Sequence, residues 1–277
     1  AIYLFNGFTG SVISTLIGST KGDFLTPSLN QLVNGNVVIS LPKWDNGSVV
    51  DAGAAIFVDG STGWGLSQTS PAVISASNAL IGSKTNDFSN ARIIRFSVGN
   101  NYLVATPEWD NGAATDAGAV TWGSGISGVS GTIGEQISLV GASLSDKIGA
   151  NYTSLATGNM LIYSSTWDNG TAYNVGAVTF ISANNPISGK VSSSNSLIGS
   201  TTNDTTGTAV FVNNNGDYLV RTPSWDNGAV ADVSAVTIGS GTTGITGVVS
   251  ISNSLVGSNT GDRLGDTIAI LPNGNFL

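Results

Sequence analysis

The sequence predicts an all-β protein: a five-bladed β-propeller of four-stranded antiparallel blades that forms one domain over residues 1–277. Three observations support this prediction: a repeat of about 58 residues, four short β-type segments in each repeat, and a chain that begins and ends inside one repeat. No helical period stands out. Propeller blades are four-stranded sheets packed around a central axis, so the segment count fits that fold.

The tetrapeptide Trp-Asp-Asn-Gly marks the repeat. It occurs at residues 44–47, 109–112, 167–170 and 225–228, with successive copies 65, 58 and 58 residues apart. Self-similarity at a fixed period is the signature of a repeat architecture. The expected repeats span residues 23–82, 87–141, 146–199, 204–257, and 262–277 together with 1–18.

Each repeat contains four candidate strands in a fixed order. The first follows a turn that ends in an aspartate, and these aspartates are Asp23, Asp87, Asp146, Asp204 and Asp262. The second lies between a Gly/Asn turn and the Trp, the third begins ten residues after the Trp, and the fourth precedes the next Asp turn. The segments are short and rich in β-branched and aromatic residues, which predicts antiparallel strands joined by tight turns.

The two ends of the chain predict closure of the ring. Residues 1–5 correspond to a third strand and residues 273–277 to a second strand, so residues 262–277 are expected to pair beside residues 1–18 in one shared blade. Closure of this kind removes exposed strand edges. The loop that would carry a fifth Trp-Asp-Asn-Gly is missing, and the first residues lack signal-peptide features, which favours an excised or processed segment.

Composition excludes several classes of partner. Charged residues make up 9% of the chain and the net charge is −8, so neither nucleic acid nor an anionic membrane surface is an expected partner. No apolar run approaches the length of a membrane span, so no membrane insertion is expected. Cysteine and histidine are both absent, which removes thiolate chemistry, histidine-dependent triads and most zinc sites.

Residues 257–277 (GSNTGDRLGDTIAILPNGNFL) and 221–241 (RTPSWDNGAVADVSAVTIGSG) resemble the FG-GAP repeat of integrin-type β-propellers. The whole chain is similar to FG-GAP-like repeats that carry Trp-Asp-Asn-Gly in large bacterial surface and haemagglutinin-like secreted proteins. The resemblance implies a propeller in an exported, adhesin-type protein. One departure matters: the turns near Asn34, Asn100 and Asn215 lack the carboxylates of the family's calcium loop, so no metal and no cofactor are expected.

The Trp-Asp-Asn-Gly loops are the main candidate for a ligand site. An exposed Trp beside Asp and Asn can stack on a sugar ring and bind its hydroxyls. The favoured interpretation is structural: Asp-Asn-Gly forms a tight turn with glycine at positive φ, and the Trp packs between blades. The candidate ligand-binding residues are Trp44, Asp45, Asn46, Trp109, Asp110, Asn111, Trp167, Asp168, Asn169, Trp225, Asp226 and Asn227, with Trp64 from an insertion at residues 59–72.

The aspartates favour architecture over catalysis. Twelve of the fifteen occupy repeat-equivalent positions, where a carboxylate caps a turn by accepting backbone hydrogen bonds. The acidic residues outside the pattern are Asp59, Asp217, Asp266, Glu108 and Glu135, and they are scattered through different repeats. No catalytic residue is therefore assigned.

The sequence predicts a non-enzymatic structural or adhesive module of a bacterial extracellular or cell-surface protein. The expected partners are further copies of the chain, or extracellular matrix or glycan. Two alternatives stay open: a lectin-like carbohydrate-binding propeller that uses the Trp loops, and a glycan-degrading enzyme that uses two of the off-pattern acids.

Overall fold

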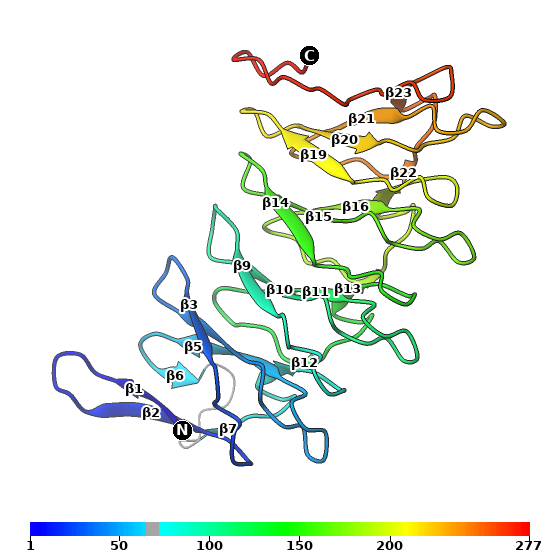
Figure 1. Ribbon diagram of the computed structural model, residues 1–277. Coiled ribbons are helices and arrows are strands. Elements are labelled where there is room, and N and C mark those ends of the chain that lie inside the picture. The colour runs from blue at the N-terminus through cyan, green and yellow to red at the C-terminus, as the bar shows by residue number, and fades with distance from the viewer. Residues whose placement is uncertain (65–71) are drawn as a thin grey trace. The chain divides into compact units, whose positions relative to one another are not determined.

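The computed structural model describes residues 1–64 and 72–277, which form five β-sheets and no helix (Figure 1). The predicted all-β class is confirmed. The chain divides into two compact units, Ala1–Val140 with Pro186–Gly189, and Gly141–Asn185 with Lys190–Leu277.

The first unit contains three sheets. The first is three-stranded, in the order β1 (Ile2–Phe5), β2 (Val12–Ile17), β7 (Ala72–Val73). The second runs β12 (Gly131–Thr132), β8 (Ala79–Ile81), β5 (Ala54–Asp59), β4 (Val37–Leu41), β3 (Ser28–Gln31), and β6 (Gly63–Trp64) also pairs with β5. The third runs β17 (Gly189–Lys190), β13 (Ser138–Val140), β11 (Ala119–Gly123), β10 (Tyr102–Thr106), β9 (Arg92–Arg95).

The second unit contains two sheets. One runs β14 (Asn151–Ser154), β15 (Met160–Ser164), β16 (Ala177–Ile181), β18 (Ser196–Ile198), β22 (Gly247–Val248). The other runs β19 (Ala209–Val212), β20 (Tyr218–Thr222), β21 (Ala235–Gly239), β23 (Ser254–Val256).

The same antiparallel register recurs from sheet to sheet. Leu103 of β10 lies opposite Trp122 of β11, and the equivalent pairs are Leu161 with Phe180 and Leu219 with Ile238. Buried hydroxyls join the third and fourth strands: Thr121 bonds Ser138 at 2.7 Å, as do Thr179 with Ser196 and Thr237 with Ser254. Each hydroxyl thereby satisfies the other, as burial requires. The repeat read from the sequence is therefore a repeat of strands, register and polar pairs.

A short parallel strand extends three of the sheets. β7 pairs in parallel with β2, β12 with β8, and β22 with β18. In the sequence, each of these two-residue strands lies between the third and fourth strands of the following repeat. One repeat therefore adds an edge strand to the sheet of the repeat before it. The sequence did not predict these strands, because two residues give no periodic signal.

The two chain ends, which were predicted to share one blade, lie in different compact units. β1 and β2 form a sheet with β7 as the third strand. Residues 269–277 form a hairpin, in which Ala269 and Leu277 exchange backbone hydrogen bonds of 2.8 Å and the N–H of Leu271 donates to the carbonyl of Asn275 at 2.8 Å. The parallel strand β7 pairs with β2, whereas a second strand would pair with the third strand, β1, so the shared blade of the chain ends stays a prediction.

The hydrophobic core lies between successive sheets within each unit. Leu16 of β2 packs in one cluster with Ile39 of β4, Ile56 of β5 and Trp44. The opposite face of the same second sheet contributes Val38 and Phe57 to a cluster with residues of β10 and β11. Because both faces of the central strands are covered, β10 is buried at all five positions and reads as a continuous apolar run.

Candidate functional site

The Trp-Asp-Asn-Gly loops are tight turns with the same backbone in every copy. In each, the Asn and a residue three positions later exchange backbone hydrogen bonds of 2.9 to 3.1 Å, as between Asn46 and Val49. The glycine has φ of +62° at Gly47, +61° at Gly112, +63° at Gly170 and +62° at Gly228. The prediction that this glycine adopts positive φ is confirmed. Residues with a side chain are disfavoured there, because only glycine, which has no Cβ atom, adopts this conformation readily.

The aspartate of each Trp-Asp-Asn-Gly loop caps the segment that follows it. One carboxylate oxygen accepts the backbone N–H of the residue six positions on, in the pairs Asp45 with Asp51, Asp110 with Asp116, Asp168 with Asn174, and Asp226 with Asp232, at 2.8 or 2.9 Å. The residues that donate these N–H groups have φ between +49° and +55°. Asp and Asn tolerate this left-handed conformation better than other non-glycine residues, which explains their recurrence at that position.

A second set of aspartates ends the turn before each first strand, and four of the five, Asp23, Asp87, Asp146 and Asp204, are buried. The Asp87 carboxylate accepts the N–H of Ser83 at 2.7 Å and of Lys84 at 2.8 Å, and its other oxygen accepts the N–H of Asp110 at 3.2 Å. Asp146 makes the equivalent bonds, including one of 2.9 Å from the N–H of Asp168. Turn capping by these aspartates was predicted, but the bonds come from three and four residues earlier in the chain and from the next loop.

Burial and hydrogen bonding act in opposite directions on these carboxyls. Burial raises the pKa of Asp87 and of Asp146, and the bonds from backbone N–H groups only partly offset it. At Asp23 burial also raises the pKa, but the hydroxyl and N–H of Thr20 and the N–H groups of Asp45 and Ser19 together lower it below its usual value. All three carboxyls are therefore engaged with the backbone, which leaves them poorly placed to bind a ligand.

The four tryptophans of the loops are buried in the core. Trp44 lies in the cluster between the first and second sheets, and Trp109 in the cluster between the second and third. Trp225 packs against residues of β15, β16 and β18 in the second unit, and Trp167 is 3% exposed. The indole N–H groups of Trp44, Trp109 and Trp225 have no hydrogen-bond partner among the described residues. These rings serve as packing residues, and none presents a face to solvent.

The insertion places Trp64 in the core as well. Trp64 ends β6, is 5% exposed and belongs to the same apolar cluster as Trp44. Residues 65–71 of the insertion at 59–72 lie outside the described residues. The amide of Asn46 donates to the carbonyl of Gly82 at 3.0 Å, so this candidate ligand-binding side chain also bonds to backbone.

The turns between first and second strands carry asparagines where the resembled family has calcium ligands. Asn34 and Asn36 both donate to the carbonyl of Gly125, at 2.7 and 2.9 Å, and Asn36 accepts the N–H of Gly60 at 3.0 Å. In the second unit Asn159 donates to the carbonyl of Gly241 at 2.9 Å. These amides join one repeat to the next. Over residues 1–64 and 72–277, no three His, Cys, Asp or Glu side chains gather as a metal site would require.

Four of the five off-pattern acids each bond to a different partner. Asp59 accepts hydrogen bonds from the hydroxyl of Ser61 and from the N–H of Thr62, which lower the pKa of its carboxyl to about 2. Asp217 accepts the N–H of Gly241, Asp266 pairs with Arg221, and Glu108 accepts from the amide of Asn90. Glu135 is the fifth. The structure brings none of these five into a described pocket.

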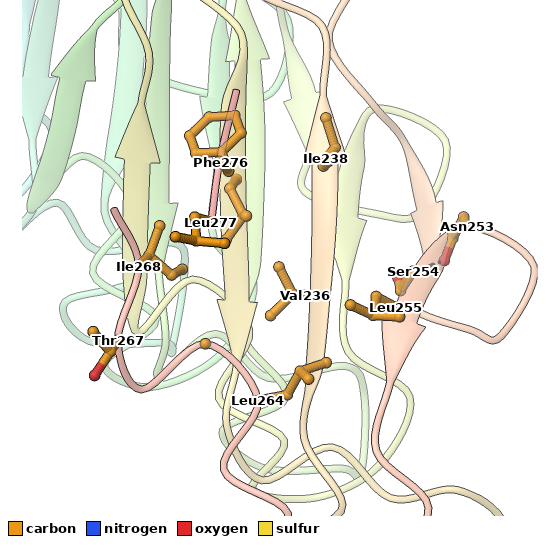
Figure 2. A pocket seen from close by; sticks show the side chains of 12 residues that line it. Val236, Ile238, Asn253, Ser254, Leu255, Leu264, Thr267, Ile268, Phe276 and Leu277 are labelled. Carbon is orange, nitrogen blue, oxygen red and sulfur yellow. Dashed lines mark hydrogen bonds between the residues drawn. The ribbon is translucent and has the colours of Figure 1, made fainter. Parts of the chain in front are cut away.

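A pocket of about 480 Å³ lies at the C-terminal end of the second unit. Figure 2 shows Val236, Ile238 and Leu255 of β21 and β23 along one side, and Ile268, Phe276 and Leu277 along the other. No charged residue lines it. This C-terminal pocket was missed by sequence reasoning, because its residues occupy repeat positions that are ordinary core elsewhere.

A family model matches the chain four times, at residues 31–91, 98–150, 154–208 and 212–266, which is more than half of its length. The chain belongs to the DUF5650 family, a repeat of unknown function. Each DUF5650 match contains one Trp-Asp-Asn-Gly loop and one turn aspartate, so the family repeat coincides with the structural one. No curated protein matches the chain in a sequence search. The described part of the chain contains no helix that is long and apolar enough to cross a membrane.

Proposed function

We propose that the chain is a non-enzymatic structural or adhesive module of a bacterial extracellular or cell-surface protein. One observation supports this most strongly: the repeated polar residues, which are the natural candidates for chemistry, bond to backbone N–H groups within and between repeats. Side chains used in this way build a rigid scaffold. The function then belongs to the surfaces that the scaffold presents to further copies, to matrix or to glycan.

The setting outside the cell is part of the same proposal. It rests on the resemblance of the repeat to integrin-type FG-GAP propellers and to Trp-Asp-Asn-Gly repeats of bacterial surface proteins. A closed five-bladed ring is part of the same proposal and rests on the same resemblance. Low charge suits an assembling surface, because few ions need to be desolvated on contact.

The two alternatives gain little from the geometry. A glycan-degrading enzyme needs two carboxyls facing each other across a cleft, whereas Asp59, Asp217 and Glu108 each bond to separate segments. A lectin that stacks sugars on the loop tryptophans needs exposed rings, whereas Trp44 and Trp109 are 3% and 4% exposed.

The test is adhesion measured beside catalysis. The purified chain is immobilised and challenged with beads coated with the same chain, with matrix proteins or with a glycan panel, and albumin-coated beads are the control. In parallel it is incubated with a panel of glycosidase substrates. We expect capture of at least one coated bead and no turnover. Turnover that is lost in Asp59→Asn or Glu108→Gln, or no capture in any arm, would overturn the proposal.

A further inference from the structure

The chain contains eight Asn-Gly pairs, and four of them belong to the Trp-Asp-Asn-Gly loops. In an Asn-Gly pair the backbone nitrogen of the glycine can attack the carboxamide carbon of the asparagine, because glycine has no Cβ to hinder the approach. The attack needs a glycine N–H that is open to water, so that it can lose its proton, and a carboxamide that is free to turn toward that nitrogen. Hydrogen bonds at either group therefore protect a pair.

In the four pairs outside the loops, one of these two groups is engaged. The glycine N–H donates to the carbonyl three residues earlier, at 2.9 to 3.1 Å, in Gly35, Gly216 and Gly274. In the remaining pair the carboxamide is held, since its oxygen in Asn6 accepts the N–H groups of Phe8 and Thr9, each at 2.9 Å. The fold thus protects all four of these pairs.

The loops of the first unit protect their asparagines by a different contact. The carboxamide of Asn46 is half-buried and donates to the carbonyl of Gly82 at 3.0 Å. Asn111 is also half-buried and engaged. The asparagines of the second unit, Asn169 and Asn227, are exposed, and their side chains make no hydrogen bond to any described residue. The same tetrapeptide therefore holds its asparagine in the first unit and leaves the carboxamide free in the second.

The glycines that follow these two asparagines are open to solvent. Gly170 and Gly228 are exposed, their N–H groups donate to no described residue, and a Cβ added to either would meet no atom within 4 Å. Each turn is closed by two backbone hydrogen bonds between the asparagine and the residue three positions later, at 2.9 and 3.1 Å, and neither bond uses the glycine nitrogen. Among the described residues, these are the two Asn-Gly pairs in which both reacting groups are free.

We infer that Asn169 and Asn227 are sites of spontaneous deamidation. The nitrogen of Gly170, after giving its proton to hydroxide, forms a bond to Cγ of Asn169. The bond from Cγ to the side-chain nitrogen then breaks, and this nitrogen leaves as ammonia with a proton from water. Hydrolysis of the resulting five-membered imide at one carbonyl gives aspartate, and hydrolysis at the other gives isoaspartate. Water is the only co-reactant, and the same steps convert Asn227. This inference does not depend on the proposed function.

The products alter the loop at a point that joins repeats. At Asn169 both add a carboxylate next to Asp168, whose own carboxylate accepts the N–H of Asn174 at 2.8 Å. The N–H of Asp168 donates to Asp146 at 2.9 Å. In isoaspartate the main chain runs through Cγ, so the carbonyl that accepted the N–H of Ala172 becomes part of a free carboxylate. Adjacent like charges and a lengthened turn both oppose the loop geometry. Modified protein should therefore unfold at a lower temperature than unmodified protein.

The experiment is incubation of the folded chain at mildly alkaline pH, followed by peptide mapping by mass spectrometry over a time course. Replacement of the amide NH₂ by OH appears as a mass increase, and an isoaspartate-specific methyltransferase labels the second product. We expect Asn169 and Asn227 to convert several-fold faster than Asn46, which is the matched control because it lies in the same tetrapeptide of the same molecule. In denaturant the three should convert at similar rates, since the fold no longer protects Asn46.

Glutamine variants add an independent measurement, the release of ammonia. Glutamine would need a larger ring for the same attack, so Asn169→Gln should release less ammonia than the unmodified chain, and Asn46→Gln should release as much. Circular dichroism checks that each variant is folded. Equal conversion at Asn46 and Asn169 in the folded chain would overturn the inference, and so would unconverted Asn169 and Asn227 after a time in which the unfolded chain converts. None of these measurements reports adhesion or glycoside turnover, so the inference and the proposed function fail separately.

Discussion

The carboxylate of Asp87 accepts the backbone N–H of Asp110, 23 residues further along the chain, at 3.2 Å. The bond joins the turn that ends one repeat to the Trp-Asp-Asn-Gly loop of the next. Asp23 with Asp45 and Asp146 with Asp168 repeat the relationship at 3.2 and 2.9 Å. Each such aspartate also accepts two N–H groups of its own turn. One side chain thus fixes both the turn and the position of the following loop.

Replacement of Asp87 is expected to destabilise the protein strongly. Asp87→Ala leaves the N–H groups of Ser83, Lys84 and Asp110 without their acceptor, and we expect a loss of about 3 kcal/mol in the free energy of unfolding. Denaturant unfolding measures it. Asp262→Ala is the matched control: its carboxylate accepts the N–H groups of Ser258 and Asn259, and it is more exposed to solvent. An equal loss in both variants would contradict this role for the inter-repeat bond.

Trp109 is expected to contribute through packing alone. Trp109→Ala opens a cavity between the second and third sheets and should lower the free energy of unfolding by about 3–5 kcal/mol. Trp109→Phe should lose much less, because it keeps most of the ring and removes an indole N–H that has no partner. Trp122→Ala, at a half-buried position, is the control for general loss of an indole. A Phe variant as unstable as the Ala variant would show that the N–H matters.

The sequence predicted the strands well and their pairing across repeats poorly. The Trp-Asp-Asn-Gly spacing located the turns, and Gly47 has the expected positive φ. Sequence reasoning took Asp87 to cap its own turn, whereas the bond to Asp110 depends on how two repeats meet. The pairing of β7 with β2 is also a contact between repeats, made by two residues. Patterns within a repeat are visible in one sequence, but contacts between repeats come from packing, and so these contacts were not predicted.

The glycine of the Trp-Asp-Asn-Gly loop is expected to be needed because its backbone adopts positive φ, and not because a side chain would clash with a neighbour. At Gly112 φ is +61° and an added Cβ would meet no atom within 4 Å. Gly112→Ala should therefore lower the free energy of unfolding by about 1 kcal/mol, the cost of a left-handed conformation for an L-residue. Gly112→Asn should lose less, since Asn tolerates that conformation. Thermal unfolding of the two variants checks the order, and the reverse order would contradict a purely conformational role.

Asp59 is expected to stabilise the protein at neutral pH and to lose that effect in acid. Hydrogen bonds from the Ser61 hydroxyl, from the Thr62 N–H and from the Ser61 N–H lower its pKa from 3.8 to about 2. A folded-state pKa below the unfolded value means that the contribution is present above about pH 4 and disappears as pH falls toward 2. The stability difference between the protein and Asp59→Asn should therefore shrink between pH 6 and pH 2. A carboxyl titration of Asp59 by NMR gives the pKa directly.

The contribution of Asp87 to stability is expected to change with pH in the opposite direction to that of Asp59. The pair of variants is therefore a sharper test than either variant alone. Burial raises the pKa of Asp87, so the folded protein binds the proton more readily than the unfolded chain does. That contribution is present at low pH and is lost as pH rises through the unfolded value near 3.8 and the higher folded one. The stability difference between the protein and Asp87→Asn should therefore grow as pH falls, while the difference for Asp59→Asn shrinks. Thermal unfolding across the same pH series measures both. If the two differences change in the same direction, hydrogen bonding outweighs burial at Asp87, as it does at Asp23, and the buried turn aspartates act as charged caps throughout the repeat.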